Sequence, residues 1–282
     1  MKQRVCRSRM QGLSLVEILI SLVIGLVVVG AVLISYIGSG QTNKLQAAYS
    51  QMNEDAQIGL SILSRDLLMA GYAQPTGVNA SSTFSRTYAD RPVFGCNNGF
   101  ASPNTTGSVA CAATGTMPAF EVVYEADIRN TVPTSADIPS DCLGAGLAQQ
   151  TVGATNFYIA SNRFYVANGN TGRPELHCAS SQGAPGQPLV DNVESMKVWY
   201  GEANAATSRQ VVRYVTAGNV ADWGLVISVR VCLLMRSAEP VLVSGEDSAT
   251  YLDCDSASQT SADRHVRRAY FTTTTLRNKM AF

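Results

Sequence analysis

The chain has 282 residues and a mass of 30.0 kDa, which is enough for one large domain or two small ones. Hydrophobic residues make up 46% of it and charged residues 15%, a composition that excludes a disordered chain and a fibrous repeat. Basic and acidic side chains balance at 21 each. This balance argues against a nucleic-acid binder that works through a broad basic field.

The basic charge is concentrated at the N-terminus. Lys2, Arg4, Arg7 and Arg9 lie within residues 1–12, which contain no acidic side chain. Removing these four leaves 17 basic side chains against 21 acidic ones, so the rest of the chain is mildly acidic.

An uncharged apolar run follows, from Ile18 to Ile37. As a helix that rises about 1.5 Å per residue, it spans about 30 Å, the thickness of the hydrocarbon core of a bilayer. The positive-inside rule places residues 1–12 in the cytoplasm and the chain after Ser39 across the membrane. The run is about twice as long as the apolar part of a secretory signal and no small-residue cleavage site follows it, so an uncut signal anchor is one interpretation.

Glu17 lies at the edge of this apolar run. A carboxylate inside a membrane-spanning segment costs about 2.5–3.5 kcal/mol on insertion and therefore indicates a functional position with a partner. Its closeness to the headgroup region also allows a simpler reading, in which the side chain snorkels. The local pattern is specific, because Gly12 precedes the apolar Leu13 and Glu17 follows four residues later.

In this pattern, residues 2–37 resemble the N-terminus of type IV pilins and pseudopilins. The short basic leader of that family ends in Gly, a prepilin peptidase cuts after it and methylates the new N-terminus, and the fifth mature residue is Glu. The resemblance implies a cut between Gly12 and Leu13, N-methylation of Leu13, and Glu17 as the fifth mature residue. The chain departs from the family in having Leu rather than Phe first, and no Pro in the apolar segment.

The resemblance also implies a role for Glu17 in an assembly charge pair. A lone carboxylate is costly in a filament core of packed apolar helices. The N-terminal ammonium of a neighbouring subunit, freed by cleavage, would neutralise it and fix the register between subunits.

Beyond the apolar run the pattern stays helical and becomes amphipathic. Apolar residues recur at steps of three and four, at Leu45, Tyr49, Met52, Ala56, Leu60, Leu63 and Leu67. Gly71, followed by Pro75, ends the pattern. We expect one helix from Leu13 to about Ala70, about 85 Å long, whose second half packs on a globular domain. A coiled coil would also give such a stripe, but paired charges at its flanks are missing.

From Gln74 onward the pattern is that of strands and loops. Residues 76–118 lack periodicity and predict a long irregular connection. Strands are expected at Phe120–Ala126, Phe157–Ala160 and Arg163–Ala167 (around a Ser161–Asn162 turn), Val193–Tyr200, Gln210–Thr216, Leu225–Met235, Val241–Ser244 and Val266–Leu276. Turns rather than helices separate them, so we predict an antiparallel sheet and the α+β class, a pilin-like fold. The expected parts are a leader (1–12), a hydrophobic helix (13–38), an amphipathic helix (39–72) and a β-rich domain (73–282).

Six of the seven cysteines lie beyond the membrane segment, where disulfides form; Cys6 belongs to the leader. We take pairing between neighbours as the working assignment, although the sequence leaves other pairings open: Cys96–Cys111, Cys142–Cys178 and Cys232–Cys254. A zinc site is the rival interpretation, but no C-x-x-C motif occurs.

The residues needed for catalysis are scarce. His177 and His265 are the only histidines, and neither belongs to a recognisable catalytic motif, so we expect no enzyme, no cofactor and no small-molecule substrate. Asp253, Asp255 and Asp247 could hold calcium, but EF-hand spacing is absent and a solvated acidic loop explains them.

Three stretches resemble PilW-like minor pilins: SRDLLMAGY at 64–72, VESMKVWYG at 193–201 and YFTTTTLRN at 270–278. The resemblance implies a minor subunit of a type IV pilus that sits in the inner membrane and then in the pilus. It would prime assembly, for adhesion and twitching motility, together with other minor pilins, the major pilin and a large tip adhesin. The alternatives are a J-type minor pseudopilin of type II secretion and an uncleaved, membrane-anchored periplasmic enzyme or receptor.

Overall fold

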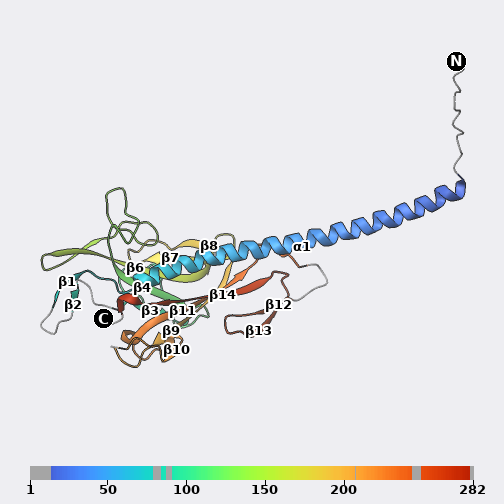
Figure 1. Cartoon of the computed structure of the whole chain (residues 1–282). Coiled ribbons are helices and arrows are strands. Elements are labelled where there is room, and N and C mark those ends of the chain that lie inside the picture. Colours follow the sequence, from blue (N-terminus) through green and yellow to red (C-terminus); the bar gives the residue numbers. More distant parts are fainter. Residues whose placement is uncertain (1–13, 79–83, 87–90, 207, 243–248, 280–282) are drawn as a thin grey trace, which may run out of the picture. The chain divides into compact units, whose positions relative to one another are not determined.

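The computed structural model describes residues 14–78, 84–86, 91–206, 208–242 and 249–279 (Figure 1). The chain divides into two compact units, residues 1–47 and residues 48–282. Helix α1 (Leu15–Met69) contributes to both, so the boundary between the units falls inside the amphipathic segment expected at 39–72.

The helix of the first unit runs through its glycines without a break. Gly25 and Gly30 both lie inside α1 and have no side chain within 4 Å of the place that a Cβ would occupy. Hydroxyl side chains in this helix donate to backbone carbonyls one turn earlier. Ser21 donates to the Glu17 carbonyl at 2.6 Å, and Thr42 donates to the Gly38 carbonyl at 3.1 Å. Such back-bonding lets hydroxyl side chains sit in an apolar helix.

In the second unit α1 is amphipathic, and its buried stripe follows the predicted spacing. The buried positions recur at steps of three and four along the helix: Met52, Ala56, Gly59, Leu63 and Leu67. Tyr49 was wrongly assigned to this stripe, because its side chain is 38% exposed, and Gly59 was missed.

The strands of the described residues form four antiparallel sheets. The largest has the order β3-β4-β6-β7-β8, with β5 paired to β6: β3 (Val93–Cys96), β4 (Ala119–Ala126), β5 (Gln149–Val152), β6 (Thr155–Asn168), β7 (Pro174–Ser180) and β8 (Gln187–Asp191). The second has the order β10-β9-β11-β14: β9 (Val193–Glu202), β10 (Arg213–Val215), β11 (Val226–Arg236) and β14 (Arg267–Thr275). Two hairpins complete the set: β1 (Pro75–Val78) with β2 (Phe84–Arg86), and β12 (Ala249–Leu252) with β13 (Ser258–Ser261).

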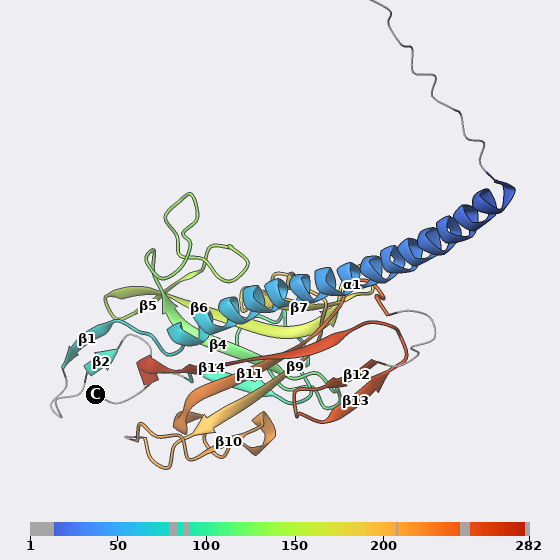
Figure 2. The ribbon, with the colours of Figure 1, turned by 45° about the vertical axis from the view of Figure 1, so that its right-hand side comes forward.

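The second half of α1 lies along both large sheets (Figure 2). At Gly59 a Cβ would lie 3.0 Å from Leu233 of β11, 3.5 Å from Val190 of β8 and 3.9 Å from Leu176 of β7. The helix therefore passes where the sheets meet, and glycine there allows a close approach. Leu233 is fully buried in β11 and packs against the helix at this point.

The remaining strand predictions differ in accuracy. β4, β9, β11 and β14 lie within a residue or two of their predicted bounds, and β10 is shorter than expected. The Ser161–Asn162 turn is wrong, because both residues lie inside the single 14-residue strand β6. Within residues 76–118, expected to be irregular, the structure has most of β1 and all of β2 and β3. Residues 241–242 are not in a strand, and the rest of the strand expected at 241–244 lies outside the described residues.

Candidate functional site

The N-terminal site predicted from the sequence is described only in part. Gly12 and Leu13 lie outside the described residues. Glu17 lies in the first turn of α1, where a carboxylate interacts favourably with the helix dipole, and its side chain is exposed. Among the described residues, no ion pair joins Glu17 to a cationic side chain.

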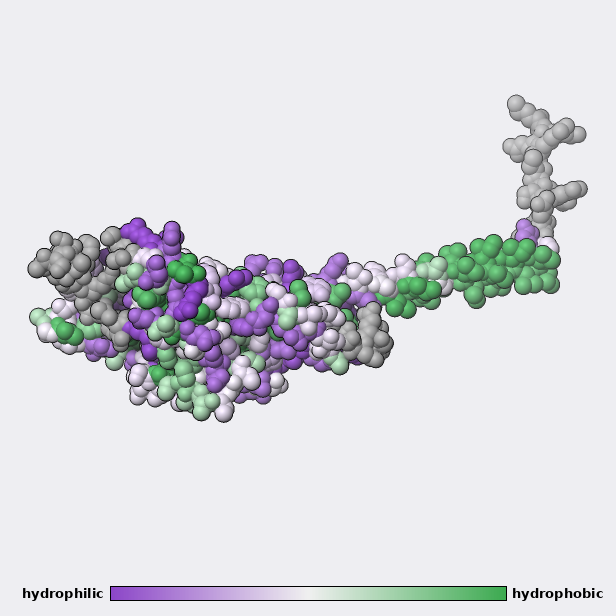
Figure 3. Space-filling view, turned by 90° about the horizontal axis from the view of Figure 1, so that it is seen from below, coloured by the Kyte–Doolittle hydropathy of each residue, from purple (hydrophilic) through white to green (hydrophobic). Residues whose placement is uncertain are grey.

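Glu17 is surrounded by exposed apolar side chains. From Leu15 to Ile37, every large hydrophobic residue of α1 is exposed, for example Leu26 at 73% and Ile34 at 75%. Figure 3 shows this part of the helix as a continuous apolar surface. Within the described residues, α1 is the one helix that is long and apolar enough to cross a membrane. Such a surface is unfavourable in water and requires lipid or other apolar helices around it.

Three disulfides stabilise the second unit, and they join neighbours along the chain as expected. Cys96 pairs with Cys111, Cys142 with Cys178, and Cys232 with Cys254. Their sequence separations are 15, 36 and 22 residues. A disulfide that closes a loop of this size contributes about 2–4 kcal/mol to stability.

Two of the stretches singled out in the sequence meet at the end of α1. Thr272 and Thr274 of β14 each lie 3.3 Å from Ser64, measured between the hydroxyl oxygens. The Asn278 side chain donates to the carbonyl of Leu68 at 3.0 Å and to that of Met69 at 3.3 Å. The Met69 carbonyl also accepts the Tyr72 N–H at 2.8 Å, and Asn278 completes the cap of the helix from about 210 residues away.

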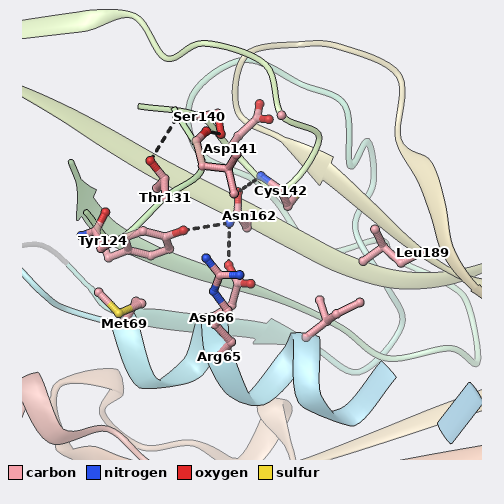
Figure 4. Close-up of a pocket in the computed structure, with 14 residues that line it drawn as sticks. Arg65, Asp66, Met69, Tyr124, Thr131, Ser140, Asp141, Cys142, Asn162 and Leu189 are labelled. Carbon is pink, nitrogen blue, oxygen red and sulfur yellow. Dashed lines mark hydrogen bonds between the residues drawn. The ribbon is translucent and has the colours of Figure 1, made fainter. Parts of the chain in front are cut away.

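Next to this joint, a cavity of about 270 Å³ opens between α1 and the large sheet (Figure 4). Its polar centre is Asn162 of β6, whose side-chain amide donates to the Asp66 carboxylate at 2.6 Å and to the Tyr124 hydroxyl at 3.3 Å. The Asn162 carbonyl oxygen accepts the Cys142 backbone N–H at 3.1 Å. Asn162 therefore ties the helix, β4 and the loop before β5 together.

Burial controls the protonation of this group. Burial raises the pKa of Asp66 to about 6, against the lowering effects of the Asn162 hydrogen bond and the Arg65 charge. Burial also raises the pKa of Tyr124, with the Asp66 charge as the next contribution, so this hydroxyl stays protonated at neutral pH. The cavity thus holds one carboxylate that titrates near neutrality.

A loop with its own hydrogen bonds forms the far wall of the cavity. One Asp141 oxygen accepts the N–H groups of Leu143 at 2.9 Å and Ala145 at 3.0 Å. The Thr131 hydroxyl accepts the Ser140 N–H at 3.2 Å. The second oxygen of Asp141 is buried without a hydrogen bond, so the wall carries a second acidic side chain, whose charge acts on Tyr124.

Neither histidine lies at this cavity. His177 Nε2 is 3.2 Å from Glu175, and its ring stacks on Tyr165 with 5.5 Å between the centroids. His265 Nδ1 lies 2.7 Å from the Ser237 carbonyl. Both contacts are structural, and neither ring faces a cavity residue.

The carboxylates of the acidic loop that was considered for calcium have hydrogen-bond and ion-pair partners within the protein. Asp253 accepts backbone N–H groups of Asp255 and Ala257 and the side chain of Gln259, while Asp255 pairs with Lys197. Asp247 lies outside the described residues. In the part of the chain that the structure describes, no three metal-binding side chains gather.

Sequence reasoning missed Asp66 and Asn162. Asp66 follows the buried Leu63 by three residues and precedes the buried Leu67, so the helical period already places it near the buried face. Asn162 gave no such signal, because Ser-Asn also suits a turn.

Two family models match the chain. The model described as "Type IV Pilus-assembly protein W" matches residues 163–278, and that described as "Prokaryotic N-terminal methylation motif" matches residues 7–33. The comparison with curated proteins gives no match. Among solved structures, a type IV-like pilin from Thermus thermophilus aligns with a TM-score of 0.39 and 11% identity, covering 82% of this chain and 98% of its own.

The described chain combines one long, apolar N-terminal helix with antiparallel sheets, the α+β architecture expected from the sequence. The two family matches support a PilW-like type IV minor pilin.

Proposed function

We propose that the chain is a minor pilin that is cut between Gly12 and Leu13, methylated at Leu13 and assembled into a type IV pilus through Glu17. The observation that carries the proposal is the exposed Glu17 carboxylate in the first turn of an exposed apolar helix. The methylation-motif match over residues 7–33 supports the processing step.

The charge pair follows from the cost of burying Glu17. In lipid or among apolar helices, an unpaired carboxylate costs about 2.5–3.5 kcal/mol. The ammonium that prepilin peptidase frees on Leu13 of a neighbouring subunit can neutralise it. Before cleavage, the terminal amine lies twelve residues further away along the chain, so processing has to precede assembly.

The same proposal assigns the location and the partners. Residues 1–12 stay in the cytoplasm until the cut, α1 crosses the inner membrane once, and the disulfide-bonded unit folds in the periplasm before incorporation into the pilus. The partners are prepilin peptidase, the major pilin and other minor pilins, with a large tip adhesin presented by their complex.

The role is assembly rather than catalysis. The subunit primes the pilus as part of a tip complex, and this supports adhesion and motility. The PilW match over residues 163–278 favours the pilus over the J-type pseudopilin of type II secretion.

The test is mass spectrometry of the membrane-bound protein. We expect N-methyl-Leu13 at the N-terminus of the wild type and a retained leader in Gly12→Ala. Gly25→Ala is the matched control, because its Cβ meets no atom within 4 Å, and it should be processed normally. A wild-type protein that keeps Met1 contradicts the proposal.

Assembly is tested by Glu17→Gln, which keeps the shape of the side chain and removes its charge. In this variant the Leu13 ammonium of the neighbouring subunit is left unpaired, at a cost of about 2.5–3.5 kcal/mol, so incorporation into sheared pili falls by a factor of about 10 or more. Glu54→Gln, at an exposed position of the same helix, should be incorporated normally. Equal incorporation of the Glu17 variant would refute the charge pair.

A further inference from the structure

The cavity beside α1 offers one carboxylate oxygen that the fold leaves free. One oxygen of Asp66 accepts the Asn162 amide at 2.6 Å, and no described residue donates to the other. In Figure 4 the Asp66 side chain points from the helix into the space below Asn162. No cationic group of the described chain lies within ion-pair distance of Asp66.

The walls around this oxygen are largely apolar. Ile62 and Met69 of α1, Val132 of the loop and Leu189 of β8 line the cavity. A ligand that fits must therefore combine an apolar stem with a polar end. A cavity of about 270 Å³ accepts a side chain rather than a large cofactor.

The charges that face Asp66 favour a cation at that end. Asp141 adds a second carboxylate from the loop, Tyr124 is neutral, and Arg65 on α1 is an exposed cation at the rim. The cavity therefore offers two acidic side chains against one solvated cation, which favours a cationic ligand.

We propose that this cavity binds an alkylammonium group, the lysine side chain of a neighbouring pilin subunit, with the ammonium on the free oxygen of Asp66. The identity of the donor rests on the proposed function, whereas the recognition of the ammonium does not. The four methylenes of lysine cover the apolar wall while its compact head reaches the carboxylate.

Two other cations fit less well. A guanidinium binds best when both carboxylate oxygens are free, and Asn162 already occupies one of those of Asp66. Calcium takes about 6–8 oxygen ligands, whereas the free oxygen of Asp66 lies among apolar walls and the described residues bring no third acid to it.

The test uses the full chain in detergent, with Nα-acetyl-lysine methylamide as the probe and the norleucine analogue as its uncharged control. Binding is followed by NMR of the methyl groups of Ile62, Met69 and Leu189. We expect the lysine probe to shift these signals at pH 7.5, and the norleucine probe to bind at least tenfold more weakly. Equal binding of the two probes overturns the proposal, and so does displacement of the lysine probe by an equal concentration of Ca²⁺ or of the arginine analogue.

Two further measurements locate the site. Asp66→Asn should weaken lysine binding at least tenfold, whereas Glu54→Gln should leave it unchanged; unchanged binding in the Asp66 variant overturns the proposal. In the wild type, the bound ammonium should lower the pKa of the Asp66 carboxyl, followed by carboxyl ¹³C shifts. A pKa that does not move with saturating probe overturns the proposal even if the variant fails to fold. Neither result depends on leader cleavage, so failure here is distinct from failure of the proposed function.

Discussion

The raised pKa of Asp66 makes the stability of the second unit depend on pH. Because the folded state holds a proton on this carboxyl to about pH 6, it binds more protons than the unfolded chain between about pH 4 and pH 6. The contribution of Asp66 to the free energy of unfolding is therefore fully present below about pH 4 and is lost as the pH rises through about 6. Asp66→Asn removes the titration and keeps an oxygen that can accept the Asn162 amide.

The magnitude follows from the two pKa values. A shift from 3.8 to about 6 corresponds, at about 1.4 kcal/mol per unit, to about 3 kcal/mol. Near pH 4 the variant and the wild type should be almost equally stable. At pH 7.5 the variant should be the more stable by up to about 3 kcal/mol, because it buries no charge.

The assay is urea unfolding of the full chain in detergent, followed by tryptophan fluorescence. Trp199 and Trp223 both lie in the second unit, so the signal reports that unit. Glu54→Gln is the matched control and should keep the wild-type difference between pH 4 and pH 7.5. An Asp66 variant with the same pH dependence as the wild type would refute the reasoning.

Two further predictions concern buried contacts. Arg163 is fully buried, with its Nε 3.0 Å from Glu121 and its guanidinium donating to the Pro103 carbonyl. In unfolding experiments, Arg163→Met should therefore cost about 3–5 kcal/mol of stability. Adding Glu121→Gln to this variant should recover part of that loss. No recovery in the double variant would show that the charge left on Glu121 is not the cause. Asn278→Ala should cost about 1 kcal/mol by the same assay, and Asn278→Asp more, since a carboxylate cannot donate to the helix carbonyls and opposes the helix dipole. If the aspartate variant were as stable as the wild type, the capping role would be wrong.

The parts of the fold that local patterns determine could be predicted from the sequence. Gly71 ends the helix as expected, with a φ of 71° that suits glycine, and its N–H reaches the Val123 carbonyl at 2.9 Å. The steps of three and four in α1 report one buried face, whereas β11 is buried on both faces and its bounds came from its run of apolar residues.

The parts that depend on distant partners could not be predicted. Ser161, Asn162 and Arg163 are three consecutive polar residues and look like a turn and its exit, yet all are buried in β6. Ser161 and Arg163 are satisfied by Glu121, some 40 residues earlier, and Asn162 by Asp66, 96 residues earlier. A local pattern contains no information on such pairs, so the cavity around Asn162 was missed as well.

The cap at the end of α1 has a consequence for the order of folding. Asn278 is 209 residues beyond Met69, so at about 5–20 residues per second about 10–40 s of synthesis separate the helix end from its cap. Cys96–Cys111 and Cys142–Cys178 join segments that are complete well within that interval. Oxidation can therefore cross-link the early half of the exported unit while the end of the helix is still hydrated. A nascent chain that stops short of residue 278 would hold its first two disulfides but lack the hydrogen bonds from Asn278 to the end of the helix.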